Sequence, residues 1–84
     1  MIRYKKIYCD FFGYKPGDFV PSELSGGEAV DIHHIIYKSR GGKDVIENLM
    51  ALTFKEHEDA HQERLKPEYL QEVHNEFMKK HGIN

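Results

Sequence analysis

The chain has 84 residues, which is enough for one domain and too few for two, so we expect a single domain over residues 1–84. Hydrophobic residues make up 39% of it, but no apolar run approaches the roughly 18 residues of a membrane helix and no signal peptide is recognisable, so we expect a cytoplasmic protein with no membrane partner. The formal net charge is −2, and Cys9 is the one cysteine, which excludes an internal disulfide and a Cys-x-x-Cys zinc site.

The N-terminal segment, to about residue 28, is the hardest to assign. Ile2 to Phe12 is rich in aromatic and β-branched residues and is compatible with a strand or a short helix. Glycine and proline mark turns at residues 13–17 and 25–27. We expect Cys9 to be a small core residue.

Two short strands are predicted next. Residues 29–36 combine β-branched content with partial alternation, which places Asp31 and His33 on the same face of a strand. The Gly-Gly pair at 41–42 breaks the chain into a loop. Residues 48–52 form a short apolar run that can pair back as the second strand.

A helix is predicted to begin just after the second strand. Thr53 and Glu56 have the spacing of a capping box, in which each side chain binds the backbone amide of the other residue. At steps of three and four, one helix face then carries Phe54, His57, His61 and Leu65.

A second helix is predicted to begin at Pro67, because proline favours a first helical turn, and to stop near Gly82. Its apolar stripe consists of Leu70, Val73 and Phe77. The same helix carries two histidines, His74 and His81, which we expect at the surface.

Four of the six histidines follow a pattern that suits a metal site. His57 and His61 lie one helical turn apart, and a third ligand must come from a facing element, for which the strand ending in His33-His34 is the obvious source. Adjacent strand residues point to opposite faces, so the pair should not share one task. We assign His33 to the metal and His34 to proton abstraction, since a pKa near 6.5 suits a base at neutral pH.

This pattern resembles the HNH nuclease family with its ββα-metal motif. The matching residues are Asp31–Ile35, Lys38–Gly42, Asn48-Leu49, Leu52, His57 and His61. The resemblance implies an α+β fold, with a ββα-metal core at residues 29–63, an N-terminal extension and a C-terminal helix. It makes His33 and His57 metal ligands, His34 the general base, and His61 a third ligand or a phosphate contact. Asn48, the middle letter of the motif, would brace the loop.

The activity implied by the resemblance is hydrolysis of DNA phosphodiester bonds with one divalent metal ion, which could be Mg, Mn, Zn or Ni. Asp31 is a candidate acceptor that orients a ligand imidazole. Three basic residues are candidate phosphate contacts: Lys38, Arg40 and Lys43. With so few base-reading elements we expect weak sequence specificity or help from a homodimer or a partner protein. A phage or mobile-element setting is compatible with the pattern.

One departure from the family lies upstream of the motif. Many members carry Cys-x-x-Cys pairs for a structural zinc, whereas this chain has Ser22-Glu23-Leu24-Ser25 there. We expect no structural zinc, and apolar packing between the N-terminal aromatic residues and the C-terminal helix in its place.

Two other interpretations stay open. His57-Glu58-Asp59-Ala60-His61 fits the H-E-x-x-H signature of zinc metalloproteases, with Glu58 as general base, but that motif leaves His33, His34 and Asn48 unexplained. The second interpretation is a non-catalytic ββα domain that only binds DNA or a protein partner.

Overall fold

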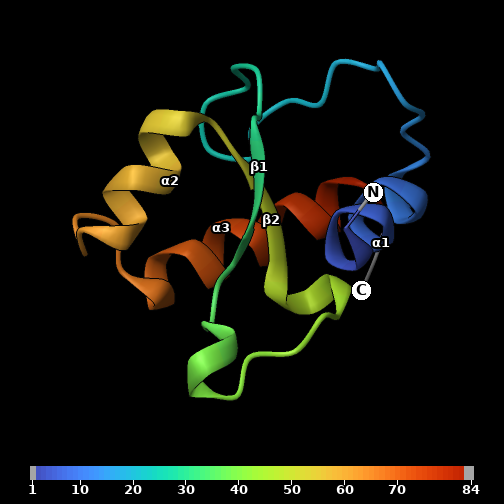
Figure 1. Cartoon of the computed structure of the whole chain (residues 1–84). Helices are drawn as coiled ribbons and strands as arrows, with labels where there is room; N and C mark the ends of the chain where they lie inside the picture. The colour runs from blue at the N-terminus through green and yellow to red at the C-terminus, as the bar shows by residue number, and fades with distance from the viewer. Residues whose placement is uncertain (1, 83–84) are drawn as a thin grey trace.

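The computed structural model describes residues 2–82 and has an α+β architecture, as the sequence predicts (Figure 1). A two-stranded antiparallel sheet lies between α1 on one side and α2 with α3 on the other. The elements, in chain order, are α1 (Arg3–Phe12), β1 (Asp31–His34), the short 3-10 turns η1 (Lys38–Arg40) and η2 (Ile46–Asn48), β2 (Leu49–Leu52), α2 (Phe54–His61) and α3 (Pro67–Lys80). None of the described helices is both long and apolar enough to cross a membrane.

The two predicted strands form and pair with each other, although β1 is shorter than the expected residues 29–36. Asp31 lies opposite Leu52, and His34 lies opposite Leu49. The ladder ends after His34, where the backbone amide of Ile36 binds the Asn48 side chain instead of a neighbouring strand. The asparagine thus sets the point where β1 gives way to the loop.

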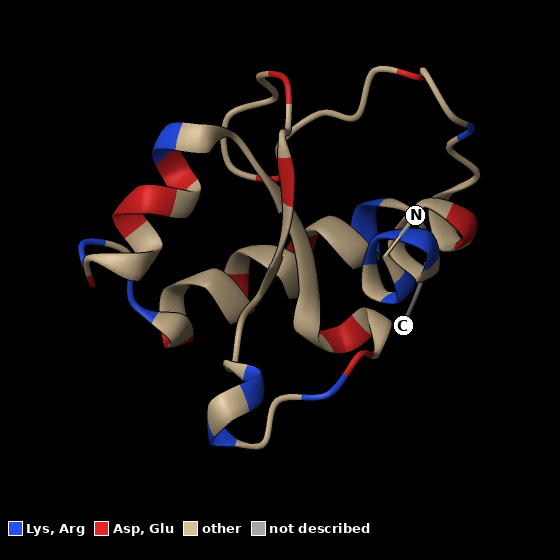
Figure 2. Ribbon diagram, viewed as in Figure 1, with Lys and Arg blue, Asp and Glu red and all other residues tan. Residues whose placement is uncertain are grey.

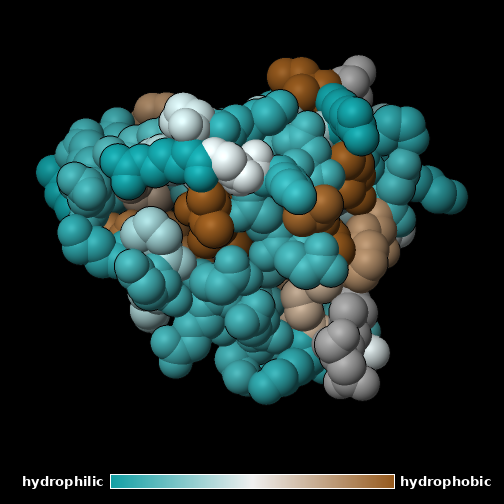
Figure 3. Space-filling view, turned by 90° about the horizontal axis from the view of Figure 1, so that it is seen from below, coloured by the Kyte–Doolittle hydropathy of each residue, from teal (hydrophilic) through white to brown (hydrophobic). Residues whose placement is uncertain are grey.

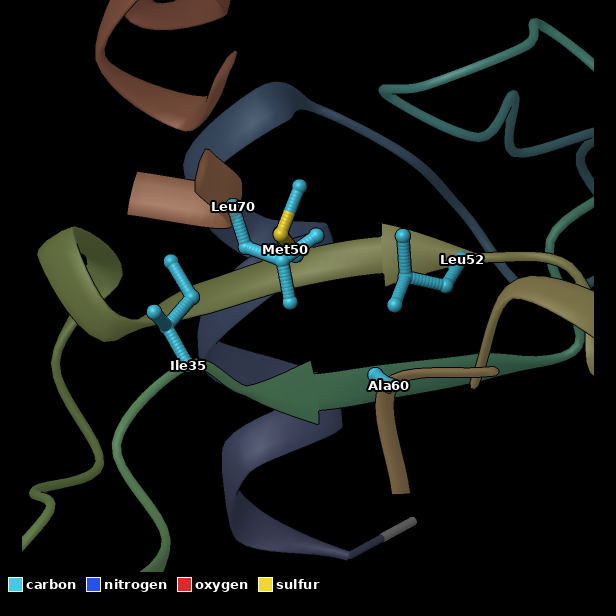
Figure 4. Close-up of a cluster of buried hydrophobic side chains, with 5 residues drawn as sticks. All are labelled: Ile35, Met50, Leu52, Ala60 and Leu70. Carbon is cyan, nitrogen blue, oxygen red and sulfur yellow. The ribbon is translucent and has the colours of Figure 1, made fainter. Parts of the chain in front are cut away.

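Both faces of β2 are buried, which explains its continuous apolar sequence. Met50 and Leu52 face α2 and α3, whereas Leu49 and Ala51 face α1. Figure 4 shows the first of these two clusters on one side of the sheet, with α1 passing behind the strands. Its fully buried members are Ile35, Met50, Leu52, Ala60 and Leu70.

Residues 3–12, whose sequence is compatible with a strand or a helix, form the helix α1. Tyr4, Tyr8 and Phe12 recur every four residues and pack against the sheet, with Tyr8 only 1% exposed. The helix ends at Gly13, whose φ of 78° is the left-handed conformation typical of a helix C-terminus. Cys9, expected in the core, is only partly buried because it lies off this packed face.

The capping box of α2 forms as predicted, with the Thr53 hydroxyl accepting from the Glu56 amide and the Glu56 carboxylate accepting from the Thr53 amide. The helix, however, ends at His61, so the prediction that Leu65 shares a helical face with the histidines was wrong. Glu63 adopts a positive φ of 60°, which turns the chain and lays Leu65 against the apolar cluster.

The second predicted helix, α3, begins with Pro67 and stops before Gly82, whose φ is 78°. His81 is exposed, as expected, but the prediction that His74 lies at the surface was wrong: it is 0% exposed. His74 lies between Leu70 and Met78 at steps of four, on the face of the helix that is buried.

A buried polar network holds His74. Its Nδ1 lies 2.7 Å from a Glu23 carboxylate oxygen, and its Nε2 lies 2.7 Å from the carbonyl oxygen of Ile46. The Tyr8 hydroxyl donates to the other Glu23 oxygen. Glu23 belongs to the segment Ser22–Ser25, and its side chain is 0% exposed. The expected aromatic packing is also present, since the Phe12 and Phe77 rings lie 5.5 Å apart.

Candidate metal centre and general base

Three imidazoles from two elements converge at one end of α2. His33 projects from β1, and its Nδ1 lies 3.2 Å from Nδ1 of His57. The Nε2 atoms of His57 and His61 lie 3.0 Å apart, one helical turn from each other. Choosing one nitrogen per ring leaves all three within 4.8 Å of one another. The structure therefore brings together the three residues that the sequence assigns to the metal.

This donor set fits a divalent transition-metal ion. Imidazole nitrogens that share one tetrahedral ion lie about 3.3 Å apart, given metal–nitrogen bonds of about 2 Å. The observed nearest separations are 3.2 and 3.0 Å. His57 turns a different nitrogen to each neighbour, so binding of all three rings to one ion would require ring rotation from the separations shown.

The protonation state of the cluster suits cation binding. Burial, together with the neighbouring imidazoles of His57 and His61, lowers the pKa of His33 to about 4. Burial also lowers the pKa of His57 from its ordinary value. Neutral imidazole is the form that binds a metal ion, and His33 is in that form at neutral pH.

Asp31 lies on the same side of β1 as His33, as the strand alternation predicts. One of its carboxylate oxygens is 3.6 Å from Nε2 of His57, and the other is 3.4 Å from the Lys5 ammonium. The carboxylate therefore lies within ion-pair distance of the His57 ring. Lys5, from α1, is an ion-pair partner that sequence reasoning missed.

His34 lies on the other face of β1, toward α1. Its ring packs edge-on against Tyr4, with ring centroids 4.6 Å apart. Its Nε2 lies 2.7 Å from a carboxylate oxygen of Asp44, in the loop between the strands. The opposite orientation of His33 and His34 follows from strand geometry, and it separates the proposed base from the proposed ligands.

Asn48 braces the loop that follows β1. Its side-chain oxygen accepts from the amide of Ile36 at 2.8 Å, and its side-chain nitrogen donates to the carbonyl oxygens of Ile36 and Lys43. The residue is 7% exposed, so these bonds replace water. The turn requires glycine at position 42, because a Cβ atom there would lie 1.7 Å from the Ile36 carbonyl oxygen.

The basic loop residues differ in how free they are to meet a phosphate. Lys38 lies 3.4 Å from Asp44, whereas Arg40 and Lys43 are exposed and make no ion pair within residues 2–82. Figure 2 shows these blue segments gathered at the lower end of the molecule, away from the acidic bands of α2. Arg40 and Lys43 are therefore the two candidate phosphate contacts without an ion-pair partner among the described residues.

A pocket of about 440 Å³ adjoins the imidazole cluster. Its lining includes Tyr37, Arg40 and His61. The Tyr37 ring stacks on His61 with ring centroids 5.4 Å apart, and sequence reasoning missed this residue although it lies four positions after His33.

The surface seen from below is mostly hydrophilic, with hydrophobic residues in separate patches (Figure 3).

Comparisons with known proteins indicate the family of this chain. Residues 8–63 match the HNH endonuclease family. A curated relative, described as a probable mobile endonuclease C of Enterobacteria phage T4, is 35% identical over 60 residues, which cover 71% of this chain and 28% of the relative. The chain thus spans less than a third of that protein's length. No solved structure matches the chain. Since the family match covers most of the chain, including both strands and α2, the protein belongs to the HNH endonuclease family.

Proposed function

We propose that this chain hydrolyses DNA phosphodiester bonds with a divalent metal ion held by His33, His57 and His61. The observation that carries the proposal is the meeting of a strand histidine with two helix histidines. The H-E-x-x-H signature uses only the helix pair and gives no role to His33. The phage relative is described as a probable mobile endonuclease, which supports the same reading and a phage or mobile-element setting.

In the proposed reaction, His34 takes a proton from a water molecule. The water oxygen then bonds to phosphorus, the bond from phosphorus to the 3′-oxygen breaks, and the departing oxygen takes a proton from solvent. A divalent cation at the imidazole cluster would stabilise the charge that develops on the phosphate and the departing oxygen. The products carry 5′-phosphate and 3′-hydroxyl ends.

The remaining residues would position the substrate and the site. Asp31 orients His57, and Asn48 keeps the loop in place beside β1. Arg40 and Lys43 contact flanking phosphates, and the pocket beside His61 has room for part of a nucleotide. We expect weak sequence specificity in this chain alone, a cytoplasmic setting where DNA is present, and Mg, Mn, Zn or Ni as the candidate ions.

Plasmid nicking with and without EDTA tests the proposal. Wild-type protein should convert supercoiled DNA to open circles with a divalent cation and should stop in EDTA. His34→Ala should lower the rate by about 10²–10⁴-fold, the usual contribution of a general base. Failure of the wild type to nick DNA with any of the four cations would contradict the proposal and favour a non-catalytic binding domain.

Glu58→Gln provides a matched control, because it removes the base that a metalloprotease would need. The proposed nuclease keeps its activity in this variant. Casein cleavage by the wild type that this variant abolishes, with no DNA nicking by either protein, would favour the protease interpretation instead.

A further inference from the structure

We propose that Asp44 is a positioning residue that holds His34 in the tautomer needed for proton abstraction. This inference rests on the proposed function, in which His34 takes the proton from water. Nothing in the sequence motif singles out Asp44, which stands in the loop directly after the basic residue Lys43. The contact between the two side chains spans ten positions along the chain and joins β1 to the loop.

The geometry fixes the His34 ring from two sides. The Asp44 oxygen lies 2.7 Å from Nε2, and the side chains are only 12% and 16% exposed. The Tyr4 ring covers the imidazole at 4.6 Å. The second carboxylate oxygen of Asp44 lies 3.4 Å from the Lys38 ammonium, which orients the carboxylate in turn. A chain of three side chains thus ends on the proposed base.

The chemistry of the contact decides which ring nitrogen is free. An ionised carboxylate only accepts hydrogen bonds, so a neutral His34 must donate from Nε2–H. The hydrogen bond to His34 and the nearby Lys38 lower the pKa of Asp44, so it is ionised at neutral pH. The lone pair of a neutral imidazole is then on Nδ1, and Nδ1 is the atom that receives the proton from water.

After this transfer the ring is an imidazolium beside a carboxylate, a charge-assisted pair that is stronger than the neutral one. Asp44 therefore favours both the correct starting tautomer and the protonated product. It need not touch the DNA, and it takes up no proton itself. The arrangement follows the logic of a carboxylate that orients a catalytic histidine.

A rival explanation is that Asp44 only adds negative charge next to the basic loop. Its removal would then strengthen binding of the DNA backbone and change KM, with little effect on kcat. A positioning role predicts the reverse pattern, in which kcat falls and KM stays the same or decreases. A purely structural role of Asp44 predicts a lower melting temperature in every variant that replaces Asp44.

The test compares wild type with Asp44→Ala, Asp44→Asn and the charge-matched control Glu47→Ala in metal-dependent cleavage of a fluorescent DNA duplex. We expect Asp44→Ala to lower kcat by about 10–100-fold without raising KM, and Glu47→Ala to retain kcat. The isosteric Asp44→Asn should also lose kcat while melting near the wild-type temperature, because its amide can donate to Nε2 and favour the wrong tautomer.

A second measurement needs no activity. Long-range ¹H–¹⁵N spectra of the imidazoles in EDTA at about pH 8, where histidine is neutral, should show His34 as the Nε2–H form in wild type and a shift toward Nδ1–H in Asp44→Asn. Unchanged tautomers, or wild-type kcat in folded Asp44→Ala, would overturn the positioning role alone. Wild-type protein that cleaves no DNA would overturn the proposed function and this role together.

Discussion

His33 and His57 are separated by 24 positions in the chain, yet their Nδ1 atoms lie 3.2 Å apart. Two features hold them there. The pairing of β1 with β2 fixes the side of the sheet on which His33 stands, and the capping box at Thr53 starts α2 directly after β2. The distance between the two rings is therefore set by short-range elements joined through one strand pair.

Asn48→Ala should destabilise the fold and lower nuclease activity. The variant leaves the amide and carbonyl of Ile36 and the carbonyl of Lys43 without their partner. Buried groups that lose a hydrogen-bond partner cost about 1–3 kcal/mol each, and solvent entry reduces that cost in a loop. Urea unfolding should show a loss of at least about 1 kcal/mol, and a variant as stable as wild type would show that Asn48 does not brace the loop.

Gly42→Ala should be more harmful than the same change at another glycine. A Cβ atom at Gly42 would lie 1.7 Å from the Ile36 carbonyl oxygen, so the backbone must move. Gly26 is a useful control, since its φ of 79° carries strain of about 1–2 kcal/mol for alanine but no atom lies within 4 Å of the new Cβ. Thermal melts of the two variants should rank Gly42→Ala below Gly26→Ala, and the reverse order would be inconsistent with the close approach.

The stability of the protein should decrease as pH rises above neutrality, through His74. Burial would lower the pKa of His74, but its hydrogen bond to Glu23 and the charge of that carboxylate outweigh burial, and the net effect raises the pKa. The extra stability is fully present below the unfolded pKa of about 6.5 and is lost as pH passes through the raised folded value.

Urea midpoints at a series of pH values provide the measurement for His74. His74→Gln should flatten this dependence and destabilise the protein at pH 6, because the buried Glu23 side chain then loses the imidazole as its partner. Exposed His81 is the control, and His81→Gln should retain the slope of wild type. An identical slope in wild type and His74→Gln would contradict the assignment.

Arg40→Ala and Lys43→Ala should weaken DNA binding and leave kcat nearly unchanged. Each removes an exposed charge of the basic loop that has no ion-pair partner within the described residues. Loss of one phosphate contact should reduce the slope of log affinity against log salt by about 1. Lys79→Ala, on α3, should not change the slope. Wild-type slopes in both loop variants would exclude the loop as the DNA contact.

Much of this molecule is readable from local sequence signals. The capping box at Thr53, the proline at residue 67 and the apolar run before α2 each determine structure within a few residues, and all three predictions are confirmed. The spacing of His57 and His61 on α2 is also a local signal. Only His33 depends on the pairing of β1 with β2 to lie near them. The family pattern covers this same part of the chain.

The features that sequence reasoning missed depend on distant partners. The N-terminal helix has an apolar pattern that a strand could share, and packing of Tyr8 against β2 decides between them. His74 is buried because Glu23, 51 positions away, supplies its partner. Asp44 looks like an ordinary loop charge until the fold brings it to His34. A step of four from Leu70 was the one local signal available for His74.

The most direct test of the account is a crystal structure of the protein soaked with Mn²⁺ or Zn²⁺ and measured at the absorption edge of the metal. The account predicts one anomalous peak bonded to nitrogens of His33, His57 and His61, at about 2.0–2.2 Å. A peak bonded only to His57 and His61 with His33 turned away, or a metal bound elsewhere in the chain, would contradict it.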